Sequence, residues 1–186
     1  MSTLSTLRML TRYSAWANQK MLAAVAALPA GVAEAPPKEK GKGFGSMVYN
    51  LNHSYVVDLI WRAHMEGTRH GFTSRNTETM PALADLTRAQ AQLDAWFIGY
   101  ADALTEAAAE EMIHFNFVDG GPGSMTRGDM LLHVVNHKTY HRGFIAEMIY
   151  QVPAKSPSID LPVYLRDGAS LAPPPLQPAP PAQLAA

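Results

Sequence analysis

Three histidines lie four residues apart in the short segment HVVNHKTYHRG: His133, His137 and His141. Burying an imidazole costs free energy unless its ring nitrogens find partners. Such a cluster can hold a metal ion, relay protons, or supply polar residues along the edge of a helix. Because the chain contains no cysteine, a transition-metal site must be built from His, Asp, Glu or water.

A helical wheel separates the three histidines. The apolar direction of this helix is set by Met130, Val134, Ile145 and Met148. At about 100° per residue, His141 falls near the middle of that face, His137 about 40° from it, and His133 on the flank. Residues four apart are about 6 Å apart along the axis, so His137 and His141 can converge on one ion. His133 is roughly 12 Å from His141 along the axis, and we expect it beside the site or on the surface.

A third ligand must come from another helix, and His53 is the best candidate. It shares a face with apolar residues at helical spacing: Tyr49, Val56, Val57 and Ile60. His70 lies in a glycine-flanked loop, and His114 is out of phase with the apolar residues of its segment. His64 is near a helix end between Arg62 and Glu66, which indicates a solvated setting. We therefore predict a metal site of His53, His137 and His141.

Carboxylates offer no clear general base. Asp58 and Glu147 are expected on solvated helix faces, where most acidic residues lie. The segment HKTYH has the HxxxH spacing of zinc peptidases, but Lys138 occupies the position of their general-base glutamate. This argues against a peptidase mechanism.

Composition limits the remaining classes of function. The chain has 186 residues, 47% of them hydrophobic and 17% charged, which is typical of one soluble globular domain. The formal net charge is -1 and no Lys/Arg stripe is present, so nucleic-acid binding is not expected. No apolar run approaches the roughly 20 residues that span a bilayer, and the N-terminus does not resemble a signal peptide. A cytoplasmic location is the default expectation.

The elements that position these residues are predicted to be helices. Helical periodicity and cap signals predict helices over 3–28, 47–65 and 84–108, and from the cap at Thr126 to about 150. Ser46 and Gly67 are expected to bound the second helix. A short extended segment over 113–117 and a glycine-rich turn over 119–123 precede the last helix. The fold class is therefore predicted as all-α, a four-helix bundle over 1–167 followed by a Pro/Ala-rich tail over 168–186.

With these residues placed, the sequence resembles the DinB family of metal-binding four-helix bundles, also called DinB/YfiT-like. LLHVVNHKTYHRG is similar to the family signature H-x-x-N-H-x-x-x-H-R-G, which is the most specific match. LTRYSAWANQKMLAAVAALP, LNHSYVVDLIW and IDLPVYLRD resemble three further segments of the family, and the resemblance extends from about residue 4 to 167. Phe144 is a departure, because the family often has glutamine after H-R-G.

The resemblance implies an up-down-down-up bundle and one divalent metal ion, usually nickel or zinc. By motif position, the family's ligands fall on His53, His137 and His141. Members are commonly homodimers, which we carry as an expectation. Some relatives are transferases or isomerases that act with a low-molecular-weight thiol.

Three functional hypotheses follow. The first is a metal-dependent enzyme that activates a thiol cosubstrate, or water, against a small-molecule substrate, by transfer or by hydrolysis. The second is a non-catalytic module that binds a metal or serves for dimerisation. The third is a protein without metal, in which the histidines form hydrogen bonds with Tyr and Asn side chains.

Overall fold

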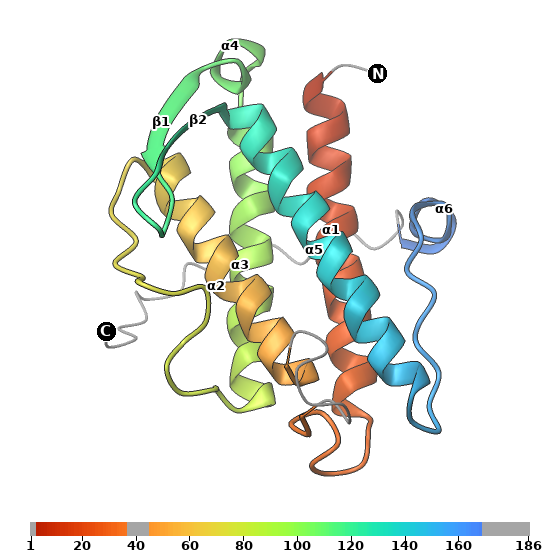
Figure 1. Cartoon of the computed structure of the whole chain (residues 1–186). Helices are drawn as coiled ribbons and strands as arrows, with labels where there is room; N and C mark the ends of the chain where they lie inside the picture. The colour runs from red at the N-terminus through yellow and green to blue at the C-terminus, as the bar shows by residue number, and fades with distance from the viewer. Residues whose placement is uncertain (1–2, 37–44, 169–186) are drawn as a thin grey trace.

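The computed structural model describes residues 3–36 and 45–168. Four long helices lie side by side in it: α1 (Thr3–Ala26), α2 (Met47–Glu66), α3 (Leu83–Ala103) and α5 (Arg127–Tyr150). α1 and α2 each pack against both α3 and α5, and in Figure 1 α1 and α5 descend whereas α2 and α3 ascend. The fold is thus mostly helical, which agrees with the predicted all-α class. The predicted tail, apart from Gly168, lies outside the described residues, as does most of the connector EAPPKEKGKGFG.

The caps of α2 and α5 form as predicted. Ser46 Oγ accepts a hydrogen bond from the Tyr49 amide, and Gly67 ends α2 in the left-handed conformation with φ 67°. At the start of α5, Thr126 Oγ1 accepts from the Asp129 amide. These caps fix where the two histidine-bearing helices begin.

The third helix is shorter than predicted, since α3 stops at Ala103 and a separate turn, α4 (Glu106–Ala109), follows. The Arg8 guanidinium of α1 donates to carbonyl oxygens at the end of α3, those of Ala101, Asp102 and Leu104. These bonds satisfy carbonyls that a helix end leaves without partners. The first helix also ends two residues before the predicted Leu28.

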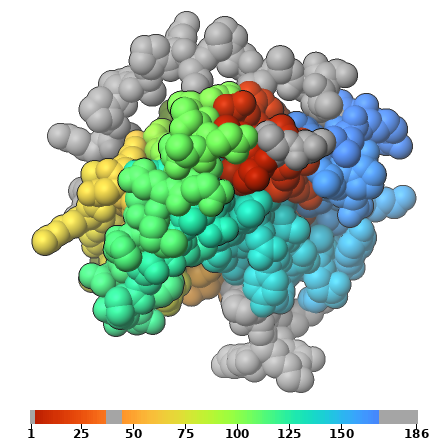
Figure 2. All heavy atoms as spheres, turned by 90° about the horizontal axis from the view of Figure 1, so that it is seen from above, coloured from red at the N-terminus to blue at the C-terminus, as the bar shows by residue number. Residues whose placement is uncertain are grey.

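A β-hairpin connects α4 to α5. β1 (Met112–Asn116) pairs antiparallel with β2 (Pro122–Thr126), opposing Phe115 to Gly123. A Cβ on Gly123 would lie 2.6 Å from the Phe115 ring, so any larger residue here would require that ring to shift. The sequence predicted an extended segment at β1 but not β2, because PGSMT lacks apolar alternation. Viewed from above in Figure 2, α4 and the hairpin (green) lie over the end of the bundle beside the first turn of α1 (red).

The apolar core consists of three clusters, one at each end of the packed helices and one along a side. At the hairpin end, Trp61 and Phe115 pack with buried residues of all four long helices. At the other end, Met21, Met47 and Ile145 form a second cluster. A third cluster lies under the C-terminal elements α6 (Leu161–Val163) and η1 (Tyr164–Gly168). Its buried residues are Tyr13, Trp16, Ala17, Val135 and Tyr164. No helix in residues 3–36 and 45–168 is long and apolar enough to cross a membrane.

Candidate metal centre

The three predicted ligands meet between α2 and α5. Each offers one ring nitrogen, and these nitrogens all lie within 4.8 Å of one another. The ring centroids of His53 are 5.3 Å from His137 and 4.6 Å from His141, and the two α5 rings are 4.5 Å apart. Within the described ranges, this is the one group of His, Asp and Glu residues with metal-binding spacing.

The environment favours neutral imidazoles, which is the form that binds metals. Burial, together with the neighbouring imidazoles, lowers the pKa of His137 to about 3. Burial and His53 lower the pKa of His141 to about 4. Burial also lowers the pKa of His53, against the opposing effect of its hydrogen bond to Asn76. All three rings are therefore neutral near pH 7, and a neutral imidazole has one unprotonated ring nitrogen.

Asn76 sets the tautomer of His53. Its amide nitrogen donates to the Tyr49 carbonyl at 3.0 Å and to Asn52 Oδ1 at 3.2 Å, so its oxygen faces the His53 ring. His53 Nδ1 lies 3.3 Å from Asn76 Oδ1 and donates to it. The lone pair of His53 is consequently on Nε2. A hydrogen bond from the other ring nitrogen is the usual support of a metal-binding histidine.

Asn52 holds the segment that carries Asn76. This side chain is fully buried on α2, and its oxygen also accepts from the backbone nitrogen and hydroxyl of Thr77, at 3.0 and 3.1 Å. The irregular connection between α2 and α3 is thereby attached to α2 beside His53. Periodicity could not reveal this contact, because the connection has no repeating pattern.

An open cleft of about 490 Å³ leads to the histidines. Its wall contains His53 and His141 together with residues of α2, the 73–76 segment and the hairpin turn: Tyr49, Asn50, Thr73, Ser74, Arg75, Asn76, Val118 and Asp119. The volume falls within the range of small-molecule sites. Two of the three candidate ligands, His53 and His141, thus line a cleft that a small molecule can enter.

The remaining histidines lie elsewhere. His133 is half-buried, with its ring 4.5 Å from Trp61 and 5.7 Å from His137, and it is outside the metal-spaced group. His114 is exposed, as predicted. The predicted solvated setting of His64 is wrong: its ring is buried and stacks on Phe115 at 4.7 Å. The hairpin, which covers this end of α2, is the cause.

A second polar group lies inside the bundle, next to the histidines in sequence but on another face of α5. Lys138 forms ion pairs with Asp58 of α2 and with Asp94 of α3, the latter at 3.3 Å. Gln90 donates to both carboxylates, at 3.3 and 2.8 Å. The prediction that Asp58 is solvated is therefore wrong, since it is fully buried. Burial, which outweighs the attraction of Lys138, raises the pKa of Asp58 to about 6.

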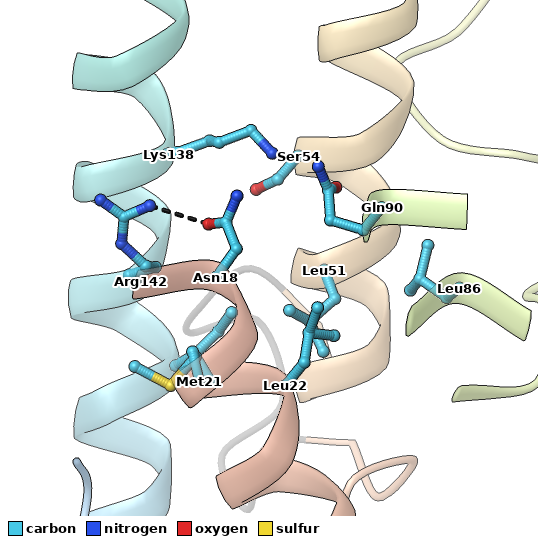
Figure 3. Close-up of a pocket in the computed structure, with 10 residues that line it drawn as sticks. Asn18, Met21, Leu22, Leu51, Ser54, Leu86, Gln90, Lys138 and Arg142 are labelled. Carbon is cyan, nitrogen blue, oxygen red and sulfur yellow. Dashed lines mark hydrogen bonds between the residues drawn. The ribbon is translucent and has the colours of Figure 1, made fainter. Parts of the chain in front are cut away.

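Arg142 extends this group toward α1. Its guanidinium donates to Asn18 Oδ1 at 2.8 Å (Figure 3). It also donates to Ser14 Oγ at 3.3 Å. Asn18 in turn donates to both carboxylate oxygens of Asp94 at 3.0 Å. Figure 3 shows that the polar ends of Lys138, Arg142, Asn18 and Gln90 lie above the apolar side chains of Met21, Leu22, Leu51 and Leu86. A cavity of about 20 Å³ lies between them, which is enough for one water molecule.

Phe144 is an apolar neighbour of the site. Its ring lies 6.1 Å from His141 and 4.8 Å from Tyr140. The side of His141 toward Phe144 therefore presents an aromatic ring.

The fold is mostly helical, and its second and last long helices bring three histidines together. These features define a class of candidate metal-binding helical proteins. A family model described as "DinB family" matches residues 1–172, and the chain belongs to this family. It is 27% identical over 167 residues to Protein DinB of Bacillus subtilis (strain 168), a match that covers 84% of this chain and 91% of the relative. The family recognised from the HRG-containing signature is thus confirmed.

Proposed function

We propose that the chain binds one divalent metal ion through His53, His137 and His141, and that it is a metal-dependent enzyme acting on a small molecule. The observation that carries this proposal is the convergence of three ring nitrogens within 4.8 Å of one another, beside an open cleft whose wall contains His53 and His141. Three protein nitrogens with an accessible remaining position are typical of catalytic sites, whereas structural sites are closed.

The residues present fit such an ion. His137 Nδ1 is buried without a hydrogen-bond partner among the described residues, and His53 directs a lone pair on Nε2 away from Asn76. Zinc–nitrogen bonds of about 2.0–2.1 Å place two ligands of one ion roughly 3.4 Å apart, within reach of small ring rotations. Imidazole ligands without thiolate suit nickel or zinc, and we propose one of these two metals.

When bound, the metal would lower the pKa of a thiol or a water in its open position and so supply a nucleophile near neutral pH. The chain contributes orientation: Asn76 holds His53, and the buried ion pairs of Lys138 hold the other face of α5 against α2 and α3. His137 and His141 are thereby kept directed at His53. Because the sequence lacks cysteine, a thiol nucleophile must be supplied as a cosubstrate.

Asp119 is the one carboxylate among the described residues of the cleft wall. Its Oδ1 accepts a hydrogen bond from the Gly121 amide in the hairpin turn, at 3.3 Å. This leaves nucleophile activation mainly to the metal. We propose thiol transfer to a small electrophile, with hydrolysis by activated water as the related reaction.

The helix directions in Figure 1 support the up-down-down-up connectivity of the DinB/YfiT-like bundle. A homodimer and a cytoplasmic location remain predictions. The alternative of a non-catalytic module is less favoured, because its metal would need no cleft of small-molecule size.

The test is conjugation of a thiol to monochlorobimane by the nickel- or zinc-loaded protein, with bacillithiol, mycothiol and glutathione as cosubstrates. We expect turnover with one of these thiols and a loss of at least 100-fold in His137→Ala. His133→Ala is the matched control, because it removes an imidazole from the same helix outside the ligand group. Turnover that survives His137→Ala would contradict the enzyme hypothesis.

A further inference from the structure

One cationic residue among the described lining of the cleft is not used by the metal site. Of the described residues that line it, Arg75 is the only lysine or arginine. Arg75 is exposed, and its guanidinium has no ion pair or hydrogen bond with any other described residue.

Most other arginines of the described chain are engaged. Five form ion pairs with a carboxylate: Arg12, Arg62, Arg88, Arg127 and Arg166. Arg8 binds backbone carbonyls and Arg142 binds Asn18. Arg69 is exposed like Arg75 but does not line the cleft. Arg75 is therefore the arginine that is both unpaired and placed at the candidate site.

The backbone around Arg75 is held in place. Ser74 Oγ donates to the Asn76 carbonyl and accepts from the Asn76 amide, at 2.5 and 3.3 Å, which closes a tight turn around Arg75. The Asn76 side chain joins this turn to α2 through Asn52, and to His53. The Arg75 backbone and charge lie close enough to the His53 ring to affect its pKa, although burial is the larger cause.

We propose that Arg75 binds a carboxylate of the small thiol that occupies the cleft, an inference that rests on the proposed thiol-dependent function. A guanidinium presents paired N–H donors that match the two oxygens of a carboxylate. Three neutral imidazoles add no charge, so a divalent ion and Arg75 outweigh Asp119 and leave the cleft positive. A thiol that also carries a carboxylate supplies one anionic group for the metal and one for Arg75.

The surroundings favour a carboxylate over a phosphate. Arg75 carries the only guanidinium among the described lining residues, and Asp119 adds a negative charge to the same wall. With the thiolate on the metal, a doubly charged phosphate would have Arg75 as its one cationic partner among the described lining residues and would be repelled by Asp119. A singly charged carboxylate matches the paired N–H donors of one guanidinium. Selectivity for carboxylated thiols follows.

The experiment is a calorimetric titration of the zinc-loaded protein with two thiols of similar size, 3-mercaptopropionate and 3-mercapto-1-propanol. We expect the carboxylated thiol to bind about 10–100-fold more tightly, the range of one charged hydrogen-bonded contact. Arg75→Gln should reduce this preference to about threefold or less, and Arg75→Lys should retain part of it. Arg69→Gln, the same change on the same connection away from the cleft, should keep the full preference.

Equal affinity of the two thiols for the wild-type protein would overturn the role of Arg75 and leave thiol binding intact. A preference that survives Arg75→Gln would overturn it as well. If neither thiol binds, the proposed thiol function is refuted, and the assignment of Arg75 is refuted with it.

Discussion

Helix α5 carries two polar groups that differ in one respect: what their side chains pair with. His137 and His141 approach His53 of α2 as neutral imidazoles, and His141 also lines an open cleft. One residue further along, Lys138 and Arg142 face the bundle interior, paired with side chains of the other three long helices. The ring nitrogens of the first group converge with one of His53, whereas the second group directs its charges to protein partners.

This difference distinguishes the residues that can bind a ligand from the residues that hold the helices in place. Buried charges are costly and persist only when they are paired, so they contribute more to defining one arrangement than to net stability. Imidazoles that stay neutral cost less to bury and can bind a metal. In this chain, the paired charges fix the position of α5 against α2 and α3. The direction of the imidazoles depends on this position.

The largest expected effect comes from breaking the paired group. Lys138→Met leaves Asp58 and Asp94 buried without their cation, and we expect a loss of about 3–5 kcal/mol in the free energy of unfolding at pH 7. Urea denaturation measures it. Adding Asp58→Asn to Lys138→Met should restore part of the loss. Lys155→Met, at an exposed lysine, should change stability by less than about 0.5 kcal/mol. An equally small loss for Lys138→Met would mean that the ion pairs are not buried.

The next effect is the pH dependence of the free energy of unfolding of the metal-free protein. The histidines and Asp58 contribute to it with opposite sign. The pKa values of His137 and His141, about 3 and 4, lie below the 6.5 of a free imidazole, so the unfolded chain binds more protons below about pH 6.5. Stability then falls as the pH drops, by about 1.4 kcal/mol per pH unit for each extra proton. Asp58, with its pKa raised from 3.8 to about 6, binds its proton in the folded state first and offsets part of this loss.

We therefore expect Asp58→Asn to steepen the loss of stability between pH 7 and 4, and His137→Ala to flatten it. Urea denaturation at pH 7, 6, 5 and 4 in the presence of a chelator measures both slopes. Identical slopes in the wild-type protein and the two variants would show that neither group titrates differently on folding.

A smaller effect is expected from the support of His53. Asn76→Ala removes the acceptor that fixes the His53 tautomer, and changes of this kind cost about 10–100-fold in metal affinity. Zinc titration by calorimetry measures the loss. Asn116→Ala, at an exposed asparagine of β1, is the matched control and should leave the affinity unchanged. Equal affinities in both variants would exclude a role for Asn76 in orienting the ring.

The smallest effect is expected at His133, which shares the four-residue spacing but contacts Trp61. His133→Ala should alter zinc affinity by about threefold or less, because the residue lies roughly 12 Å along the helix from His141. A loss comparable with that of a ligand variant would mean that His133 binds the ion. The titration used for Asn76→Ala serves here too.

Much of the site could be predicted from the sequence, because helical periodicity alone places side chains around an axis. It selected His53, His137 and His141, and the structure brings these three together. Cap residues also fixed the starts of α2 and α5, since their hydrogen bonds are local in sequence.

Contacts between distant segments could not be predicted in this way. Asn76 lies in a connection without periodicity, and its role depends on Asn52, 24 residues earlier. Asp58 was expected in solvent because acidic residues are usually exposed, and only the approach of Lys138 from another helix makes its burial tolerable. His64 was misplaced for the same reason, since the hairpin that covers it is remote in sequence.

The most direct test of the central claim is a calorimetric titration of metal-free protein with zinc and with nickel, for the wild type, His53→Ala and His114→Ala. We expect one ion per chain, an affinity loss of more than 100-fold in His53→Ala, and no change in His114→Ala, where the lost imidazole is exposed. Absence of stoichiometric binding, or unchanged affinity in His53→Ala, would contradict a metal site shared between α2 and α5.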